Sequence, residues 1–143
     1  MKIFKRILFY FLSFTWGFIM SFIGLFPIAV LACMKKVHVY HGRLYGVIGK
    51  HWGGVNFGCF FLVCEDQQFD DYCRAHECGH GIQNLIWGPL MPFVISIPSA
   101  IRYWYRELHF YRKDLTPNTD YYDIWFEKQA SLFGINLVMS DKF

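Results

Sequence analysis

The stretch CRAHECGHGIQN, residues 73 to 84, carries most of the information about fold and function in this sequence. It contains His76-Glu77-Cys78-Gly79-His80, which has the form HExxH. On a helix this pattern presents two imidazoles, one turn apart, to a single tetrahedral zinc ion. The glutamate then lies beside the metal, where it accepts a proton from a water molecule whose pKa zinc lowers to about 7. A hydrolytic zinc site is therefore the first hypothesis.

The residues around the motif predict the helix that it needs. Asp70 or Asp71 is a suitable N-cap for a helix over residues 72–87, and a Gly-Pro pair follows directly. Such a helix places both histidines of the motif on one face. Gly79 and Gly81 lower the helix propensity, and we expect their small size to admit another backbone, or a substrate, near the metal.

Zinc needs a third protein ligand, and the downstream sequence offers one. The extended motif with a third histidine six residues after the second is excluded, because Ile86 stands at that position. The other common form takes a glutamate from a later helix, with a small residue three positions on that lets the two helices approach. Glu127-Lys128-Gln129-Ala130 has this form. The alternative for Glu127 is a solvated helix residue paired with Lys128 or Lys113.

A structural zinc site with sulfur ligands is the competing hypothesis. Its ligands would be Cys73, His76, Cys78 and His80. On a continuous helix, however, the two cysteines point away from the histidine face, which disfavours this set. The sequence contains 5 cysteines and no CxxC pair, so free thiols are expected rather than a disulfide framework.

The composition indicates a small membrane protein. The 143 residues are 55% hydrophobic and only 17% charged, which is unusual for a soluble domain of this size. The net charge of +3 is small, and the basic residues flank apolar segments instead of forming a run. This distribution favours lipid head groups over nucleic acid as a partner.

The uncharged segment from Ile7 to Cys33 predicts a transmembrane helix, so residues 1–36 are expected to form a membrane anchor. As a helix the segment would be about 40 Å long, against roughly 30 Å of hydrocarbon. Gly24 and Pro27 predict a kinked and tilted span. The stretch is longer than the apolar region of an ordinary signal peptide, and cleavage before Cys33, as in a lipoprotein, is the remaining alternative. The flanking basic residues are nearly balanced, so they do not define an orientation.

Two stretches after the anchor predict a β-hairpin. Residues 37–49 (VHVYHGRLYGVIG) and 55–64 (VNFGCFFLVC) are rich in β-branched and aromatic residues, and Gly53-Gly54 between them is a turn signal. Near the end of the chain, residues 121–134 (YYDIWFEKQASLFG) predict an amphipathic helix that Gly134 terminates. Residues 37–143 are therefore expected to form one domain of the α+β class.

Residues 82–101 are uncharged and mostly apolar, but Pro89, Pro92 and Pro98 interrupt them. Because prolines break a membrane helix, we predict an interfacial or re-entrant segment rather than a second complete span. A single crossing would also leave the two histidines of the motif and Glu127 on opposite sides of the bilayer. One zinc ion could not then bind all three.

Several motifs, in a fixed order, resemble a family of small bacterial membrane proteins. They are GGVNFG, HECGHGIQN, GPL, IPSAIRYW and YDIWFEKQA.LFG, and they extend over roughly residues 44–134. The family carries an HEYGH-type motif followed by an E-x-x-A helix, and it is similar to zincin metallopeptidases of the gluzincin type. Cys78 departs from the family pattern, which has an aromatic residue at this position.

The resemblance implies a fold, a site and a location. The fold is an N-terminal transmembrane helix followed by a β-hairpin packed on a minimal zincin-like helical core. The ligands of Zn²⁺ are His76, His80 and Glu127, and Glu77 is the general base. Residues 57–63 are expected to line the cleft and to bind an extended peptide by β-addition. The protein is expected to be integral to the bacterial cytoplasmic membrane.

No residue clearly supplies the donor that stabilises the oxyanion, and His109, Tyr121 and Tyr122 are the candidates. The first functional hypothesis is a membrane-anchored zinc-dependent metallopeptidase that hydrolyses peptide bonds near the bilayer. The alternative is a catalytically inactive zincin-like membrane protein that acts as a binding partner or structural protein. A third hypothesis is that the HExxH pattern is accidental.

Overall fold

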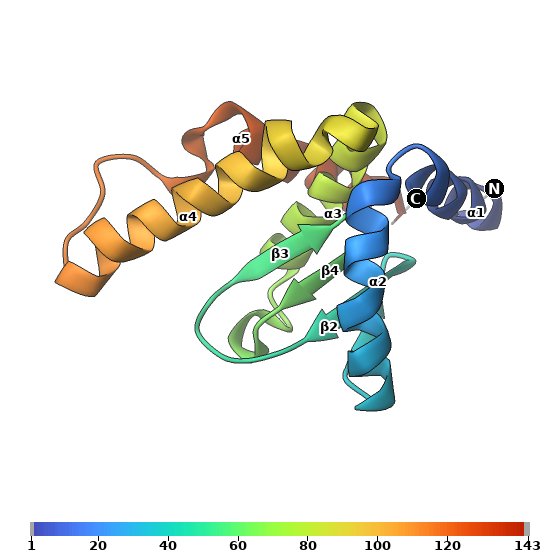
Figure 1. The fold of residues 1–143 in the computed structure, drawn as a ribbon, viewed down its shortest axis with the longest axis horizontal. Helices are drawn as coiled ribbons and strands as arrows, with labels where there is room; N and C mark the ends of the chain where they lie inside the picture. The colour runs from blue at the N-terminus through green and yellow to red at the C-terminus, as the bar shows by residue number, and fades with distance from the viewer. Residues whose placement is uncertain (1, 142–143) are drawn as a thin grey trace.

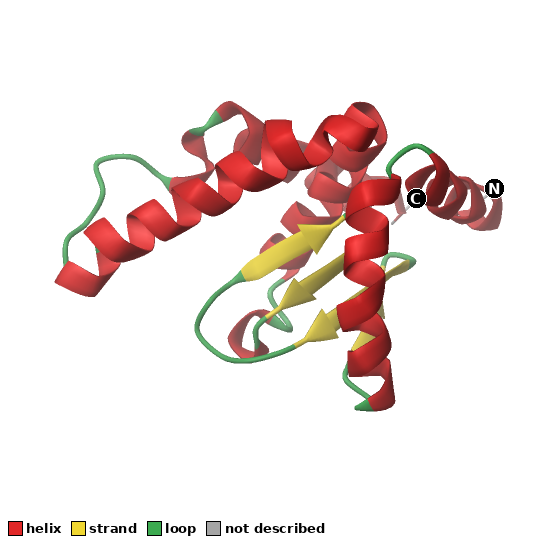
Figure 2. Cartoon of the chain, viewed as in Figure 1, coloured by secondary structure: helices red, strands yellow, loops and turns green. Residues whose placement is uncertain are grey.

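A four-stranded sheet lies between two layers of helices in the computed structural model, which describes residues 2–141 and has an α+β architecture (Figures 1 and 2). The order of the strands in the sheet is β1-β2-β4-β3. β1 pairs antiparallel with β2, β2 pairs parallel with β4, and β4 pairs antiparallel with β3. The strands are β1 Val37–Tyr40, β2 Arg43–Val47, β3 Gly54–Phe57 and β4 Phe60–Val63.

This sheet corrects the predicted two-stranded hairpin, because each predicted strand is itself a tight hairpin. His41 and Gly42, between β1 and β2, have positive φ angles of 45° and 77°, as in the two-residue turns that reverse a chain within a hairpin. Gly58, between β3 and β4, has a φ of 67°. The two hairpins then join through the parallel pairing of β2 with β4, which no local sequence pattern predicts.

The two faces of β4 pack against different helices. Phe61 and Val63 lie in one apolar cluster with Cys73 and Cys78 of α3 (Asp71–Trp87). Phe60 and Leu62, on the other face, lie in a second cluster. This cluster also contains Ile28 and Leu31 of α2 (Phe18–Cys33) and Phe9 of α1 (Lys2–Thr15). The predicted anchor therefore packs on the sheet instead of standing apart from the domain.

The segment expected to form one helix over residues 7–33 is divided into α1 and α2, whose axes differ by 104°. The break falls at Gly17 and not at Gly24 or Pro27, and Pro27 lies inside α2. The side chain of Asn84 from α3 fills the space where a Cβ of Gly17 would lie, and its Nδ2 donates to the Gly17 carbonyl at 3.1 Å. Within residues 2–141, no single helix is long and apolar enough to cross a membrane.

Helix α3 forms as predicted. The Asp70 side chain accepts hydrogen bonds from the backbone N–H groups of Tyr72 and Cys73, at 2.8 and 3.3 Å, and so provides the N-cap. The helix ends before Gly88, which has a positive φ of 51°. The motif therefore lies within a regular helix.

The apolar segment after α3 is broken, as its prolines predict. A 3₁₀ turn (Gly88–Leu90) and a π-helical turn (Pro92–Ser96) lead into α4 (Ile97–His109). The axis turns by 117° at this break. In Figure 1, α4 runs along the top of the molecule and away from the sheet.

Helix α5 (Trp125–Asp141) begins later and extends further than the predicted helix over residues 121–134. A 3₁₀ turn (Tyr121–Asp123) precedes it. Gly134 does not terminate α5, because it lies inside the helix where α5 touches α3. A Cβ on Gly134 would lie 1.8 Å from the Ala75 carbonyl oxygen, so this glycine permits helix contact.

Candidate metal centre

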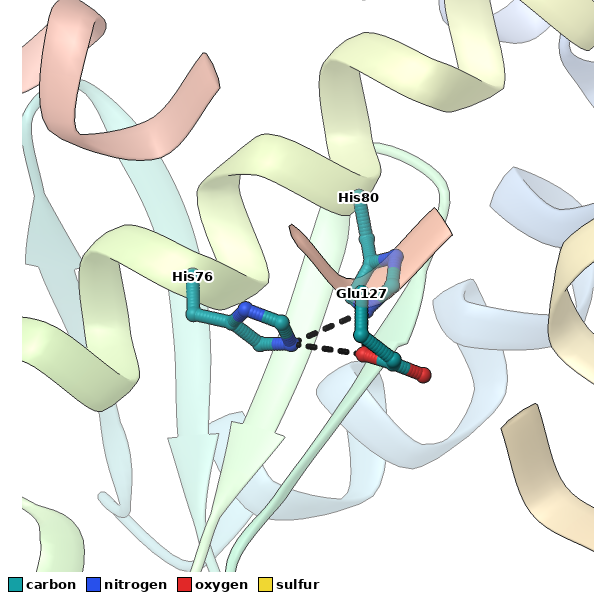
Figure 3. A group of neighbouring side chains, drawn as sticks. All are labelled: His76, His80 and Glu127. Atoms are coloured by element: carbon teal, nitrogen blue, oxygen red, sulfur yellow. Dashed lines mark hydrogen bonds and ion pairs between the residues drawn. The ribbon is translucent and has the colours of Figure 1, made fainter. Parts of the chain in front are cut away.

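Three side-chain atoms from two helices meet at one buried point (Figure 3). His76 Nε2 lies 3.1 Å from His80 Nε2 and 3.0 Å from Glu127 Oε2. His80 Nε2 lies 3.2 Å from the same carboxylate oxygen. The exposed fractions of His76, His80 and Glu127 are 4%, 6% and 0%. The three residues therefore form a buried group that could hold a metal ion.

The group exists because α3 and α5 approach closely at small residues. A Cβ on Gly79 would lie 1.8 Å from the carbonyl oxygen of Ala130. Gly134 makes the equivalent approach to Ala75 one step further along the interface. The expectation that Gly79 admits another backbone is confirmed, and that backbone belongs to the helix that carries Glu127.

Hydrogen bonding defines the tautomer of His80. Gln83 Nε2 donates to the carbonyl oxygen of Phe126 at 2.8 Å and to Gln129 Oε1 at 2.9 Å. Because a backbone carbonyl can only accept, the amide nitrogen of Gln83 must face Phe126, and its Oε1 must face His80. That oxygen lies 2.7 Å from His80 Nδ1, so Nδ1 carries a proton and Nε2 is free to present a lone pair.

A second network gives His76 the same tautomer. Ser131 Oγ donates to the Glu127 carbonyl oxygen at 3.2 Å and accepts from the Tyr72 hydroxyl at 3.1 Å. Its remaining lone pair accepts from His76 Nδ1, which lies at 2.9 Å. In its neutral form, each imidazole therefore directs an unprotonated Nε2 atom at the same point.

The two oxygens of Glu127 have separate partners. Oε1 accepts a short hydrogen bond from Ser99 and a longer one, at 3.4 Å, from the Tyr121 hydroxyl. Oε2 faces the two histidines. Each histidine thus binds a neighbouring side chain through Nδ1 and faces the group with Nε2. Glu127 does the same with Oε1 and Oε2. Outer partners of this kind orient metal ligands in proteins.

In the absence of a metal ion, the buried carboxylate of Glu127 favours a proton on His80 over one on His76. Burial alone would lower the pKa of His80, but the hydrogen bond with Glu127 and the nearby carboxylates raise it. Burial prevails at His76, whose pKa is lowered. Burial would raise the pKa of Glu127, but hydrogen bonds with both histidines hold it well below its usual range. Of the two imidazoles, His80 therefore takes up a proton more readily than His76.

Metal binding is expected to weaken as the pH is lowered. A metal ion competes with protons for His80, and the raised pKa of His80 extends this competition to higher pH than at an ordinary histidine. Calorimetric titration of Zn²⁺ in buffers of different ionisation enthalpy should show proton release that grows as the pH is lowered. An affinity independent of pH would contradict this competition.

Glu77 lies next to the group but is not part of it. Its carboxylate is buried, and its Oε2 has no hydrogen-bond partner within residues 2–141. Burial and the charge of Glu127 raise the pKa of Glu77 to about 7, against the opposing effect of His80. Gly54 of β3 leaves room for this side chain, since a Cβ there would lie 2.7 Å from Glu77 Oε1.

β3 is the strand beside Glu77, whereas β4 packs against Cys78 of the motif. The Asn56 side chain of β3 donates to the Glu77 carbonyl oxygen at 2.9 Å. β4 pairs with β2 on one side and β3 on the other, so the expectation that residues 57–63 receive an added peptide strand is wrong for most of that range. β3 lies at the outer edge of the sheet, next to Glu77.

Of the other residues predicted for the site, two tyrosines lie at the metal centre, whereas a histidine and two cysteines do not. Tyr121 bonds Glu127, and the Tyr122 ring lies edge-on to the His76 ring with centroids 4.9 Å apart. His109 bonds the Tyr105 carbonyl on α4. Cys73 and Cys78, the proposed sulfur ligands, lie in the apolar cluster between α3 and the sheet. Tyr72, Gln83, Ser99 and Ser131 were not predicted as part of the site.

Replacing Gln83 by leucine is expected to weaken metal binding by about 10- to 100-fold, because His80 loses the acceptor that orients its ring. The matched control is Gln129→Leu, which removes only an outer partner and leaves Gln83 bonded to Phe126. Competition with a chelating dye would measure both affinities. Equal affinities for the two variants would contradict the assigned role of Gln83.

Comparisons with protein-family models, with curated proteins and with solved structures found no match.

Proposed function

We propose that this protein is a membrane-associated zinc-dependent peptidase in which His76, His80 and Glu127 bind Zn²⁺ and Glu77 is the general base. The observation that carries the proposal is the convergence of three lone-pair donors on one buried point. With both Nδ1 atoms protonated, the two Nε2 atoms and Glu127 Oε2 direct lone pairs at one another. A cation or a shared proton between these three atoms would offset their repulsion.

Zinc is the proposed ion because it fits both the donor set and the motif. Two imidazole nitrogens and one carboxylate oxygen are one of the ligand sets of catalytic zinc sites, and the HExxH spacing favours zinc over non-haem iron, which uses the same donors. Tetrahedral zinc bonds of about 2.0–2.1 Å would separate the ligand atoms by about 3.3 Å, close to the observed separations of 3.0 to 3.2 Å. Calcium and magnesium prefer oxygen ligands and more of them.

The residues around the group could perform peptide hydrolysis. Zinc in such a site acts as a Lewis acid that polarises the carbonyl of the substrate and acidifies water. Glu77 would accept the proton of the attacking water and pass it to the leaving amine nitrogen. Without a metal ion the pKa of Glu77 is about 7, and the charge of a bound ion would lower it and so favour the ionised form that acts as a base. The Tyr121 hydroxyl is the candidate donor to the developing oxyanion because it lies beside the group, and it would exchange its long bond to Glu127 for one to the substrate.

The edge strand β3 is the proposed binding place for an extended substrate. Its outer side faces no other strand of the sheet, and its first residue, Gly54, lies against Glu77. A peptide added along β3 would therefore pass the general base. Hydrogen bonds of this kind recognise the peptide backbone and do not depend on the identity of the side chains. They therefore support a peptide substrate without defining its sequence.

Exposed apolar side chains support membrane association. Phe26 of α2 is 77% exposed, and Ile3 and Phe4 of α1 are 73% and 69% exposed. Most of the surface of each of these side chains is therefore uncovered within the described part of the chain. We propose that α1 and α2, a bent pair rather than one span, attach the protein to the bacterial cytoplasmic membrane.

Glu77→Gln is expected to abolish proteolysis while leaving zinc bound. Loss of a general base costs about 10²- to 10⁴-fold in rate, and the amide keeps the shape of the side chain. Zinc content by elemental analysis and cleavage of a peptide library by mass spectrometry would be measured for the wild type and the variant. The control is Glu65→Gln, which changes an exposed glutamate paired with Lys50.

Each outcome decides between hypotheses. One zinc ion per chain with cleavage that depends on Glu77 supports the peptidase. Zinc without such cleavage favours the inactive zincin-like partner protein. A wild-type chain that purifies without zinc and does not bind it with submicromolar affinity would overturn both.

A further inference from the structure

Helix α4 and the turn before it expose a continuous apolar stripe. Phe93, Ile97, Ile101, Trp104 and Leu108 follow one another at intervals of four, four, three and four residues, so they lie on one helical face. Their exposed fractions are between 45% and 67%. An apolar face of this length needs a partner, since single exposed side chains are common but contiguous patches are not.

The opposite face of α4 binds the segment that enters the metal centre. Arg102 donates from Nε to the Tyr121 carbonyl at 3.1 Å and from Nη2 to the Asp120 carbonyl at 2.9 Å. Arg106 is buried and donates to the Thr119 carbonyl at 2.7 Å. Two arginines one turn apart thus hold three successive carbonyl groups.

The same face also reaches the carboxylate of Glu127. Ser99 donates to Glu127 Oε1 and lies 3.2 Å from the Tyr121 hydroxyl, which bonds the same oxygen. Ser99 therefore acts directly on the metal ligand, and the two arginines act on it through Tyr121. A movement of α4 away from the core would remove both hydroxyl groups from Glu127.

The composition of α4 favours a lipid surface over another protein as the partner of the stripe. Residues 82–101 carry no charge, and the exposed basic pair Arg112-Lys113 follows the C-terminal end of the stripe, whereas Arg102 and Arg106 are engaged on the opposite face. Trp104, Tyr105 and Tyr111 are exposed in the same region. Exposed aromatic side chains, with a basic pair at the end of an apolar stripe, are typical of helices that lie among lipid head groups.

We propose that α4 lies on the membrane surface by this stripe, and that lipid contact holds Ser99 and Tyr121 against Glu127. The helix then has one face for the bilayer and one for the site, so attachment to lipid and the order of the metal centre are coupled. The proposal rests on the membrane association proposed above, but it does not depend on zinc or on proteolysis.

The lipid contact is tested with spin labels on the full chain in vesicles of phosphatidylcholine and phosphatidylglycerol. Labels would be placed by Ile101→Cys and, as an aqueous control, Phe69→Cys, both in a Cys33→Ser background because Cys33 is the exposed thiol among the described residues. The label at 101 should be relaxed more by oxygen than by a water-soluble nickel chelate, and the label at 69 the reverse.

Two results would overturn the lipid contact. Water-like relaxation at 101 would exclude it, and dipolar broadening between labels at 101 would identify the stripe as a contact between two copies of this chain. A third label, by Phe26→Cys on α2, separates this proposal from the broader one. Lipid relaxation at 26 but not at 101 rejects only the role of α4, whereas water-like relaxation at both positions rejects membrane association itself.

The coupling is tested by hydrogen exchange of residues 119–127 in chelator-treated protein bound to the same vesicles. Ile101→Glu should raise exchange there on the order of tenfold, although this side chain lies on the face opposite Ser99 and Arg102. Arg106→Gln should do the same by removing a bond to Thr119. Phe69→Glu, an equal change at another exposed apolar residue, should have no effect. Unchanged exchange in Ile101→Glu would overturn the coupling.

Discussion

Gly79→Ala is expected to force α3 and α5 apart and to abolish metal binding. The added methyl group would lie 1.8 Å from the Ala130 carbonyl oxygen and 2.6 Å from its carbon. Both partners are backbone atoms, so no side chain can rotate to make room. Alanine gains about 1 kcal/mol of helix propensity over glycine, but overpacking of this severity costs about 3 kcal/mol or more.

The metal centre is sensitive to this separation because its ligands come from both helices. Ala130 lies one turn after Glu127, so a shift of α5 at Ala130 moves the carboxylate away from the histidines. Chemical unfolding in detergent and zinc titration would measure the two effects. Gly81→Ala is the control on the same helix, since its methyl group would come no closer than 3.0 Å to any neighbour.

A Gly79→Ala protein with unchanged stability and unchanged zinc affinity would show that the helices do not approach at this position. Loss of stability in Gly81→Ala as large as in Gly79→Ala would instead point to an unspecific effect of alanine in α3. Gly134→Ala should behave like Gly79→Ala, because it makes the same approach to the Ala75 carbonyl oxygen.

Glu127→Gln is expected to lower zinc affinity by more than about 100-fold, beyond the effect of losing an outer partner. The amide has nearly the same shape and can still accept from Ser99, so packing is preserved. It supplies no negative charge, however, and Glu127 is the only anion among the three ligand residues. Competition with a chelating dye would measure the change, with Glu107→Gln on α4 as the control.

The same substitution has a consequence for folding without metal. Hydrogen bonds with His76 and His80 lower the pKa of Glu127, so the ionised carboxylate stabilises the fold above its unfolded pKa. This stabilisation is lost as the pH falls through the lower, folded value. Glu127→Gln should therefore destabilise the chelator-treated protein at neutral pH and less so in strong acid. Full zinc affinity in Glu127→Gln would remove Glu127 from the ligand set.

The helical half of the site could be predicted because its signals are local. The caps of α3, the spacing of His76 and His80, and the small Ala130 after Glu127 are each readable within a few residues. The chemistry of zinc links these separate segments, which is why a ligand from a distant helix could be proposed without any contact information.

The sheet could not be predicted to the same extent. The turn at His41-Gly42 lies inside a stretch whose alternation continues through it, so two strands look like one. The parallel pairing of β2 with β4 joins residues that are not adjacent in sequence, so no short sequence pattern predicts it. The glycine at 134 was misread for a related reason, because a helix end and a close helix contact both favour glycine.

The outer partners of the ligands were missed because they look like ordinary polar residues. Gln83 follows His80 by three positions and Ser131 follows Glu127 by four, so both lie one helical turn from a ligand and on its face. That spacing is a usable signal once the ligands are known. Ser99 carries no such signal, since it comes from a helix whose direction depends on the break at the prolines.

The bond between Asn84 and the Gly17 carbonyl has a consequence for how far the protein can reach. Asn84 lies one turn after His80, and Gly17 is the corner between α1 and α2, so a direct hydrogen bond joins the region proposed for membrane attachment to the helix that carries the candidate metal centre. An enzyme on a flexible tether samples many heights above a bilayer. In the proposed peptidase, the site would instead work at a nearly fixed height, and it would select a bond by its distance from the lipid as much as by the residues around it.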